Sequence, residues 1–470
     1  MKIVIVGSGI SGLAAAFSIL KSNPTADLTV LESEQRSGGI ISTRLESGCV
    51  IEEGPDSFLT TKPWALELCQ SLNLENQILQ TNEAHRRAFI AIDGQLQPLP
   101  EGFMLLAPTK FYPFLDSKIL SAGGKLMAVL EIFRSSVQGD VDETLKSFAV
   151  RRFGQEMFDR IVQPMVGGIY TGDPAKLSAL ATVPQFVEME RKHGSIGKAI
   201  LNNNLVKSSD SGARYSAFVT LKSGLQTLTD ALTDAIGRDK IHLGSRVRQL
   251  SQVGQRWRLS TSDGTDVDAD IVVIATPARA SSSVLQSVDP ALSADLAAVE
   301  HSSSVVLNML FDGDDIGHPM HGFGFVVPEL ERRSIIACSF SSTKFKGRAP
   351  QNKVLMRVFL GGVLHPDVFA LSDGDLVQSA LKDLRTYLKI KSYPQKVWIK
   401  RWPNSMPQYN VGHLQLVKRI EEHFARHDRL IWAGSALRGV GIPDCVRVGF
   451  EAAQRVQEFT KADKDPVAVV

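Results

Sequence analysis

Short continuous hydrophobic runs mark the first structural elements of the chain. Lys2-Ile-Val-Ile-Val6 is rich in β-branched residues and has no polar alternation, a pattern typical of a parallel strand that is buried on both faces. Leu28-Thr-Val-Leu31 and Arg429-Leu-Ile-Trp-Ala433 predict two further strands. Because the helix-forming segment LAAAFSILK follows the first run, the N-terminus predicts a strand and a helix of an α/β fold.

The middle of the chain shows other periodic patterns of apolar residues. In residues 108–210, apolar residues recur at intervals of three and four in KLMAVLEIF, TLKSFAVRRF and QEMFDRIVQPMV, which predicts amphipathic helices. Residues 300–362 contain apolar runs with β alternation, SVVLNMLFD, GFGFVVP, SIIACSF and KVLMRVFLGG, and we expect a mixed sheet that Ala88–Ile92 joins as a further strand. Asn202 to Asn204 and Lys207 to Gly212 predict a surface loop.

Composition narrows the class of protein. The chain has 470 residues, of which 43% are hydrophobic and 22% charged, and this near-average composition excludes wholesale disorder. Lys and Arg number 52 against 50 Asp and Glu, so the net charge of +2 lacks the basic excess of a nucleic-acid binder. The four cysteines form no CxxC pair and no apolar run reaches about 18 residues, so we expect a cytoplasmic protein without a disulfide framework or membrane-spanning helix.

A glycine-rich segment joins the first strand to the first helix. Gly7-Ser8-Gly9-Ile10-Ser11-Gly12 has the GxGxxG spacing of a dinucleotide-binding turn. Gly7 is expected to allow the tight turn, Gly9 the approach of a pyrophosphate, and Gly12 the packing of the helix on the sheet. The phosphates are expected at the helix N-terminus, and Glu32, at the end of the second strand, is expected to accept both ribose hydroxyls.

The residues after Glu32 favour FAD over NAD. Glu32, Arg36 and the pair Gly38-Gly39 form the pattern E-x-x-x-R-x-G-G, which resembles the flavin-binding extension of the superfamily of amine oxidases and protoporphyrinogen oxidases. In that superfamily the paired glycines let the backbone approach the cofactor, and the arginine lies beside it. The resemblance therefore implies an FAD cofactor, with Ser33 among its contacts.

A second glycine-rich turn lies near the C-terminus. Gly434-Ser435-Ala436 follows a predicted strand, and Gly439 to Cys445 is expected to form a turn that opens the helix VRVGFEAAQRVQEF. Such a turn exposes backbone N–H groups at a helix N-terminus, which suits the flavin pyrimidine edge or a phosphate.

Further blocks narrow the resemblance to one branch of the superfamily. GSGISGLAAA at 7–16, GPDSF at 54–58, GIYTGD at 168–173, MPQY at 406–409 and GVGIPDC at 439–445 resemble the bacterial oxygen-dependent protoporphyrinogen and coproporphyrinogen III oxidases over essentially the whole chain. The resemblance implies FAD contacts at Gly7, Ser8, Gly9, Ile10, Ser11, Gly12, Glu32, Arg36, Gly39, Gly54, Pro55, Asp56, Ser57, Val247, Trp402, Ser435, Val440, Gly441 and Ile442.

The predicted cofactor contact at Val247 is also supported by the local sequence pattern. The segment IHLGSRVRQL predicts a strand, a turn and a second strand, a usual place for a backbone clamp on adenine, although an ordinary buried strand residue is the alternative. The following segment RWRLSTSDGTDVDADIVVIATP predicts a β-meander that ends on a buried strand.

These patterns together predict the architecture. We expect an α/β fold class with a discontinuous, Rossmann-like FAD-binding domain over residues 1–80, 218–285 and 402–470. A mixed-sheet substrate domain is expected over 81–107 and 286–401, and an inserted helical domain over 108–217.

No motif predicts acid–base, nucleophilic or metal catalysis. A Ser-His-Asp order, a nucleophile elbow and an HExxH motif are all missing from the sequence, and the ten histidines are dispersed. Hydride transfer from a porphyrinogen meso carbon to flavin N5 requires orientation and a dry pocket more than a strong base. We therefore predict no catalytic side chain and no metal ligand.

A few residues are predicted to contact the substrate. The backbone of Gly168 and Ile169 is expected to hydrogen-bond the pyrrole N–H groups, because carbonyls are acceptors and glycine admits a flat ring, although a structural turn is the alternative. Lys62 matches a basic position of the family and is the leading partner for a propionate, although a solvated lysine is the alternative. Arg44, Arg151 and Arg152 are weaker candidates.

The resemblance implies FAD-dependent oxidation of coproporphyrinogen III to coproporphyrin III in haem biosynthesis, with O2 as acceptor and hydrogen peroxide as second product. Protoporphyrinogen IX is the close alternative substrate, and amine oxidation is a more remote one. The expected partners are therefore a tetrapyrrole, O2 and a downstream chelatase, with no nucleic acid.

Two apolar-aromatic segments predict peripheral membrane contact. Phe103–Ala107 and Phe111–Leu115 lie near Lys110, Lys118 and Lys125, a combination suited to a membrane surface. Packing inside the helical domain is the alternative.

Overall fold

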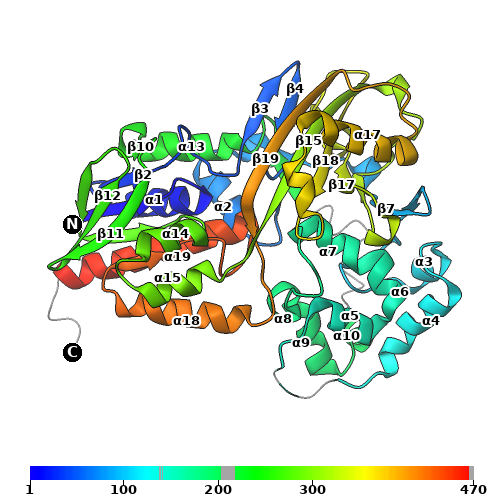
Figure 1. The fold of residues 1–470 in the computed structure, drawn as a ribbon, viewed down its shortest axis with the longest axis horizontal. Helices are drawn as coiled ribbons and strands as arrows, with labels where there is room; N and C mark the ends of the chain where they lie inside the picture. Colours follow the sequence, from blue (N-terminus) through cyan, green and yellow to red (C-terminus); the bar gives the residue numbers. More distant parts are fainter. Residues whose placement is uncertain (137–138, 140, 203–217, 465–470) are drawn as a thin grey trace.

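A five-stranded parallel sheet forms the centre of the first half of the fold (Figure 1). The computed structural model describes residues 1–136, 139, 141–202 and 218–464. The strand order is β10-β2-β1-β14-β20, and in this order the strands are Ile241–His242, Asp27–Leu31, Lys2–Val6, Ile271–Ile274 and Leu430–Trp432. The predicted N-terminal strand is therefore confirmed as the central strand of the sheet.

Both faces of this sheet are covered. Ile3 and Ile5 pack toward α1 (Ile10–Ser22), α13 (Gln226–Ile236) and α19 (Ile442–Lys464). Val4 and Val6 pack toward a three-stranded antiparallel sheet and toward α14, α15 and α18. Because successive strand residues point to opposite faces, a run of five apolar or amphipathic residues is what such a strand requires.

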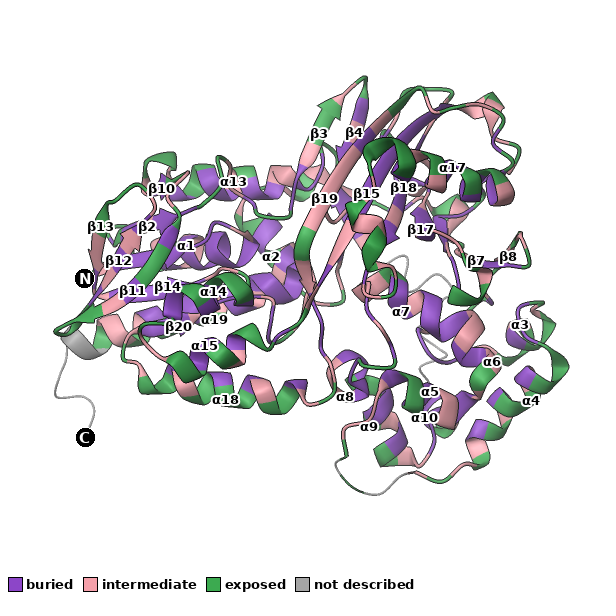
Figure 2. Ribbon diagram, viewed as in Figure 1, coloured by how far each residue is buried: buried purple, intermediate pink, exposed green. Residues whose placement is uncertain are grey.

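The elements on the second face have the following bounds. The antiparallel sheet contains β11 (Val247–Val253), β12 (Arg256–Thr261) and β13 (Asp266–Ala269), which confirms the predicted meander. The helices are α14 (Ala278–Leu285), α15 (Pro290–Ala297) and α18 (His413–Arg426). Figure 2 shows that the central strands are buried and that the outer surface of α18 is exposed.

The second half contains a seven-stranded sheet in the order β19-β15-β18-β17-β16-β7-β8. In this order the strands are Lys396–Pro407, His301–Asp312, Lys353–Gly361, Ile335–Ser339, Gly324–Val326, Phe89–Ile92 and Gln95–Pro98. β16 and β7 pair in parallel, whereas all other neighbours are antiparallel. The prediction of a mixed sheet that the segment near residue 90 joins is therefore correct.

Smaller elements cover this sheet and connect it to the first half. Helix α17 (Asp373–Leu388) packs on one face, and the hairpin of β3 (Thr43–Glu46) and β4 (Cys49–Glu52) packs on β15, β18 and β19. A short sheet contains β5 (Phe58–Leu59), β9 (Phe218–Leu221) and β6 (Ile78–Gln80). The short helix α2 (Trp64–Ser71) follows β5.

A helical body occupies the lower right of Figure 1. Its principal helices are α3 (Phe111–Asp116), α4 (Ala122–Val129), α5 (Leu145–Phe153), α7 (Gln163–Tyr170), α9 (Pro184–His193) and α10 (Ile196–Asn202). Phe114, Phe148, Phe153 and Phe186 are buried in its core. The predicted surface loop lies outside the described residues from residue 203 onward.

The predicted α/β class is confirmed by this arrangement of sheets and helices. The exact domain boundaries stay a prediction. Two local predictions were wrong. Helix α19 begins at Ile442, within the segment expected to be a turn, because Pro443 suits a first helical turn and Asp444 is favourable there. In the segment 103–107, Leu105, Leu106 and Ala107 are buried in the core and are not available to a membrane.

Candidate functional site

The turn between β1 and α1 contains three glycines with different surroundings. Gly7 has a φ of +103°, and a Cβ there would lie 2.9 Å from the carbonyl oxygen of Ala275. A Cβ on Gly12 would overlap the carbonyl oxygen of Gly7, so the fold itself requires both glycines. A Cβ on Gly9 would have no protein atom within 4 Å. Gly9 therefore borders open space at the N-terminus of α1, which fits a position that a phosphate approaches.

Glu32 is buried at the end of β2, beside this turn. Its Oε2 accepts hydrogen bonds from the backbone nitrogen and the hydroxyl of Ser8, both at 2.7 Å. Its Oε1 accepts from the hydroxyl of Ser33 at 3.1 Å and from the nitrogen of Glu34 at 2.9 Å. The backbone donors fix the carboxylate, whereas the serine hydroxyls can rotate away, so two acceptor positions can be released to ribose hydroxyls.

Arg36 organises the loop that follows β2. Its guanidinium donates to the carbonyls of Ser37, Gly39 and Ile41. The nitrogen of Gly38 donates to the carbonyl of Ser8 at 2.8 Å, and Gly39 has a φ of +58°. The two predicted cofactor segments, 7–12 and 32–39, therefore lie side by side, and the arginine holds the shape of the second segment.

Val247 begins β11 close to Glu32. The nitrogen of Ser245 donates to the carbonyl of Glu32 at 2.7 Å, and Val247 is buried and pairs with Thr261. The structure thus brings Val247 to the acidic end of β2, but its role as a clamp on adenine stays a prediction.

The segment Gly54-Pro55-Asp56-Ser57 follows β4 and touches the same loop. A Cβ on Gly54 would overlap the carbonyl oxygen of Ile40, so this contact requires glycine. The ammonium of Lys344 lies 3.1 and 2.9 Å from the two carboxylate oxygens of Asp56, and Nη1 of Arg357 lies 3.2 Å from Oδ2. Burial alone would raise the pKa of Asp56, but the two cations hold it well below its usual range.

Trp402 and Tyr409 connect this group to the C-terminal turn. Nε1 of Trp402 donates to the carbonyl of Glu53 at 2.7 Å. The hydroxyl of Tyr409 donates to the carbonyl of Ser435 at 2.6 Å and accepts from the nitrogen of Gly439 at 2.8 Å. Burial raises the pKa of Tyr409, which keeps this hydroxyl protonated and able to donate.

The predicted contacts Val440, Gly441 and Ile442 lie at the N-terminus of α19. The side chain of Cys445, in the first turn of that helix, lies beside the side chain of Ser11 in α1. The C-terminal turn therefore adjoins the N-terminal glycine turn. The predicted cofactor residues form one connected group, although their contacts with FAD stay predictions.

A cavity of about 310 Å³ lies between α7 and the seven-stranded sheet. Its wall is mostly apolar and includes the rings of Phe89, Phe103, Phe218, Phe323, Phe325 and Phe359. Gly168 and Ile169 also line it, from the last turn of α7, and their hydrogen bonds to pyrrole N–H groups stay a prediction beside a purely structural role. The last carbonyls of a helix have no intrahelical partner, and among the described residues the carbonyls of Gly168 and Ile169 accept no hydrogen bond.

Lys344 is a pocket residue that sequence reasoning missed. It ends the short helix α16 (Ser341–Lys344) and supplies the one charged side chain among the described residues of the cavity wall. No local motif marks it, because its partner Asp56 lies 288 positions earlier in the chain. Arg357 was missed for the same reason.

Lys62 does not line this cavity in the described structure. Its ammonium lies 2.7 Å from both carboxylate oxygens of Asp444, at the start of α19. The side chain is 44% exposed, so it is neither free in solvent nor buried. Its role toward a propionate stays a prediction, and a propionate would have to compete with Asp444.

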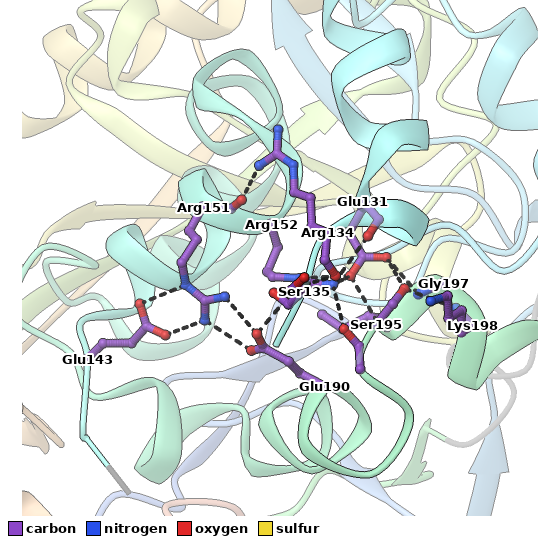
Figure 3. A network of polar contacts seen from close by, with 12 residues as sticks. Glu131, Arg134, Ser135, Glu143, Arg151, Arg152, Glu190, Ser195, Gly197 and Lys198 are labelled. Atoms are coloured by element: carbon purple, nitrogen blue, oxygen red, sulfur yellow. Dashed lines mark hydrogen bonds and ion pairs between the residues drawn. The ribbon is translucent and has the colours of Figure 1, made fainter. Parts of the chain in front are cut away.

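The weaker arginine candidates are already paired. Arg152 is fully buried and binds Glu131 and Glu190, and Arg151 contacts Glu143 and Glu190 at 2.5 and 2.6 Å (Figure 3). Arg44 lies 3.0 Å from Glu53. Arg152 is fully buried in the helical body and Arg151 is 28% exposed, and neither is among the described residues that line the cavity. Their suggested contact with the substrate stays a prediction.

Within residues 1–136, 139, 141–202 and 218–464, no three His, Cys, Asp or Glu side chains are arranged to hold a metal ion. In the same part of the chain, every helix is too short or too polar to cross a membrane.

The chain is similar to known proteins over nearly its whole length. It is 34% identical over 457 residues to coproporphyrinogen III oxidase of Bacillus subtilis, covering 95% of this chain and 96% of that protein. It is 31% identical to coproporphyrinogen III oxidase of Staphylococcus aureus, covering 97% and 98%. A crystal structure from Exiguobacterium sp. 255-15, described as a candidate protoporphyrinogen oxidase, has a TM-score of 0.87 at 30% identity and covers 97% and 98% of the two chains.

The family model of flavin-containing amine oxidoreductases matches residues 10–457, which include helix α1, the cavity wall and most of α19. A flavin is the cofactor that this family uses, and the open space over Gly9 leaves room for its phosphates. The chain belongs to the family of flavin-containing amine oxidoreductases.

Proposed function

We propose that the protein is an FAD-dependent oxidase that converts coproporphyrinogen III to coproporphyrin III, with O2 as electron acceptor, in haem biosynthesis. One observation carries the proposal: an apolar cavity of about 310 Å³ lies beside the predicted cofactor group, in a chain that matches coproporphyrinogen III oxidases at full length. The reaction removes six electrons and six hydrogens from the macrocycle and forms three molecules of hydrogen peroxide from three of O2.

The predicted cofactor residues would hold FAD in an extended form. The open space at Gly9 fits the pyrophosphate, and the serine hydroxyls on Glu32 fit exchange with ribose hydroxyls. The segments at 54–57 and 435–442 supply backbone groups toward the flavin ring. Bound FAD would supply a hydride acceptor that O2 can reoxidise.

The cavity wall supports a reaction that depends on orientation. Aromatic and aliphatic side chains exclude water and present flat surfaces to a macrocycle. The carbonyls of Gly168 and Ile169, which accept no hydrogen bond from the described residues, can accept hydrogen bonds from pyrrole N–H groups, which would fix the ring in the cavity. No side-chain base is required, since the pyrrole protons can leave through tautomerisation.

Two alternatives remain for the substrate. Protoporphyrinogen IX shares the macrocycle and is the substrate named for the Exiguobacterium relative. The charge of the cavity argues against amine oxidation. The charged side chain among its described lining residues is a lysine, which repels an ammonium substrate.

A reduction assay tests the proposed function. The purified holoprotein should be yellow, anaerobic coproporphyrinogen III should bleach its flavin absorbance, and admission of air should restore the colour and produce porphyrin fluorescence. Bleaching by polyamines in place of porphyrinogens would overturn the proposal in favour of amine oxidation. No bleaching by any porphyrinogen would overturn it in favour of a non-catalytic flavoprotein.

A further inference from the structure

The cavity carries a local excess of positive charge. Lys344 and Arg357 both bind the single carboxylate of Asp56, so this group of three side chains has a net charge of +1. Arg357 is 4% exposed, whereas Lys344 is 14% exposed and lines the cavity. The excess charge is therefore accessible to a ligand through Lys344.

The surroundings of Lys344 favour an anionic ligand. Its ammonium lies 3.1 Å from the hydroxyl of Ser57 and within 5.0 and 5.7 Å of the ring centroids of Phe345 and Phe218. Apolar walls weaken the competition of water for a charged group, so a carboxylate that reaches Lys344 gains more there than at a solvent-exposed lysine.

The two alternative substrates differ in the groups that could reach Lys344. Coproporphyrinogen III carries four propionates, whereas protoporphyrinogen IX carries two and has vinyl groups at the other two positions. A vinyl group against Lys344 would leave its ammonium partly desolvated and without a new partner, which penalises the two-carboxylate substrate.

We propose that Lys344 binds a propionate carboxylate of the substrate inside the cavity and thereby favours the four-carboxylate porphyrinogen over the two-carboxylate one. This inference rests on the proposed porphyrinogen oxidase function. It assigns the role to a residue other than Lys62, because Lys344 is among the described residues that line the cavity and Lys62 is not.

The test compares Lys344→Met with a matched control, Lys346→Met. Lys346 lies two positions away, is exposed and undergoes the same change of charge and shape. Holoenzymes are assayed for kcat/KM on both porphyrinogens and titrated with coproporphyrin III and its uncharged tetramethyl ester. We expect Lys344→Met to lower kcat/KM for coproporphyrinogen III relative to kcat/KM for protoporphyrinogen IX by about tenfold. The variant should also bind coproporphyrin III more weakly, whereas its affinity for the ester should not change. Lys346→Met should leave both quantities unchanged, and Lys344→Arg should retain most of the preference.

A second measurement uses the wild-type holoenzyme and needs no variant. Reductive methylation of Lys344 should be slowed by coproporphyrin III and much less by its tetramethyl ester, with Lys346 as the internal reference. Equal protection by both compounds, or an unchanged substrate ratio in a flavin-replete Lys344→Met enzyme, would overturn the inference. If porphyrinogen oxidation itself were missing from the wild type, the proposed function would fail instead, so the two failures are distinguishable.

Discussion

At the scale of single residues, two glycines of the first turn are required by the fold and a third is explained by a ligand. Gly7 and Gly12 are confined by protein atoms, whereas Gly9 is confined by none. A glycine at a position where the chain tolerates a side chain is explained most simply by a molecule that approaches the backbone. Asp56 is a second residue whose surroundings are informative, because its carboxylate is shared by Lys344 of α16 and Arg357 of β18.

Gly9→Val should give a folded protein without flavin. The valine side chain would occupy the open space that the pyrophosphate requires, whereas its Cβ would have no protein atom within 4 Å. Flavin absorbance and thermal unfolding of the purified variant check this. Gly12→Val is the contrast, because it would collide with Gly7 and destabilise the fold itself. Retained flavin absorbance in Gly9→Val would contradict the assigned phosphate position.

Asp56→Asn should lower the free energy of unfolding in a pH-dependent way. The variant leaves two cations without their carboxylate, at a cost of about 3 kcal/mol at neutral pH. Because the folded pKa of Asp56 lies below its unfolded value, its stabilisation is complete above the unfolded pKa and is lost as pH falls below about 4. Urea unfolding at pH 7, 5 and 3.5 should show that the difference in free energy of unfolding between wild type and variant narrows only at the lowest pH. A difference that stays constant would contradict a stabilising ion pair of Asp56 with Lys344 and Arg357.

At the scale of elements, the helical body is held by a buried ion network as well as by apolar packing. Glu131 accepts hydrogen bonds from the hydroxyl of Ser195 at 2.7 Å and from the nitrogens of Ile196 and Gly197, both at 2.9 Å, at the start of α10. Arg152 of α5 binds the same carboxylate (Figure 3). The network therefore ties α5 and the N-terminus of α10 to the segment after α4.

Arg152→Met should destabilise the helical body by about 3 kcal/mol, because it leaves the fully buried Glu131 without its guanidinium partner. Urea unfolding monitored by circular dichroism measures this. The matched control is Arg238→Met, which breaks an exposed pair with Asp234 and should cost less than about 0.5 kcal/mol. Equal losses in the two variants would mean that the buried network contributes no more than a surface ion pair.

At the scale of the whole molecule, the helical body has a patch of large apolar side chains that the described part of the chain leaves exposed. Phe111, Tyr112, Leu126 and Phe133 are 52%, 80%, 58% and 79% exposed along α3, α4 and the following turn. Lys110, Lys118 and Lys125 lie among them in the sequence, so the patch combines apolar surface with positive charge. Peripheral membrane contact by this patch stays a prediction, as do cytoplasmic location and transfer of the product to a chelatase.

Vesicle sedimentation tests the membrane prediction. The double variant Tyr112→Ser, Phe133→Ser should lose binding to vesicles that contain anionic lipid, because it removes two exposed rings of the patch. Leu45→Ser, which changes a side chain that is 67% exposed on the distant strand β3, should bind like wild type. Equal binding of all three proteins, or none by wild type, would contradict the prediction.

The sequence by itself determined the elements whose signal is local. The run at Lys2–Val6 predicted a strand buried on both faces, the spacing of Gly7, Gly9 and Gly12 predicted the turn, and the apolar periodicities predicted the helical body and the mixed sheet. These patterns are local because hydrogen bonding and side-chain direction repeat within a few residues. The sequence blocks that resemble the family predicted a flavin cofactor, and the match to the family model supports this prediction.

Only the tertiary structure decided which distant side chains meet. Lys344 reaches Asp56 across 288 positions, Arg152 turns into the core of the helical body, and Lys62 pairs with Asp444 across 382 positions. A charged residue carries the same sequence signal on the surface, in a buried pair or in a ligand cavity, because its environment is created by packing and not by its neighbours in the chain. The net charge of +2 thus did not indicate that Lys344 lies in the cavity wall, where we place the recognition of a polycarboxylate.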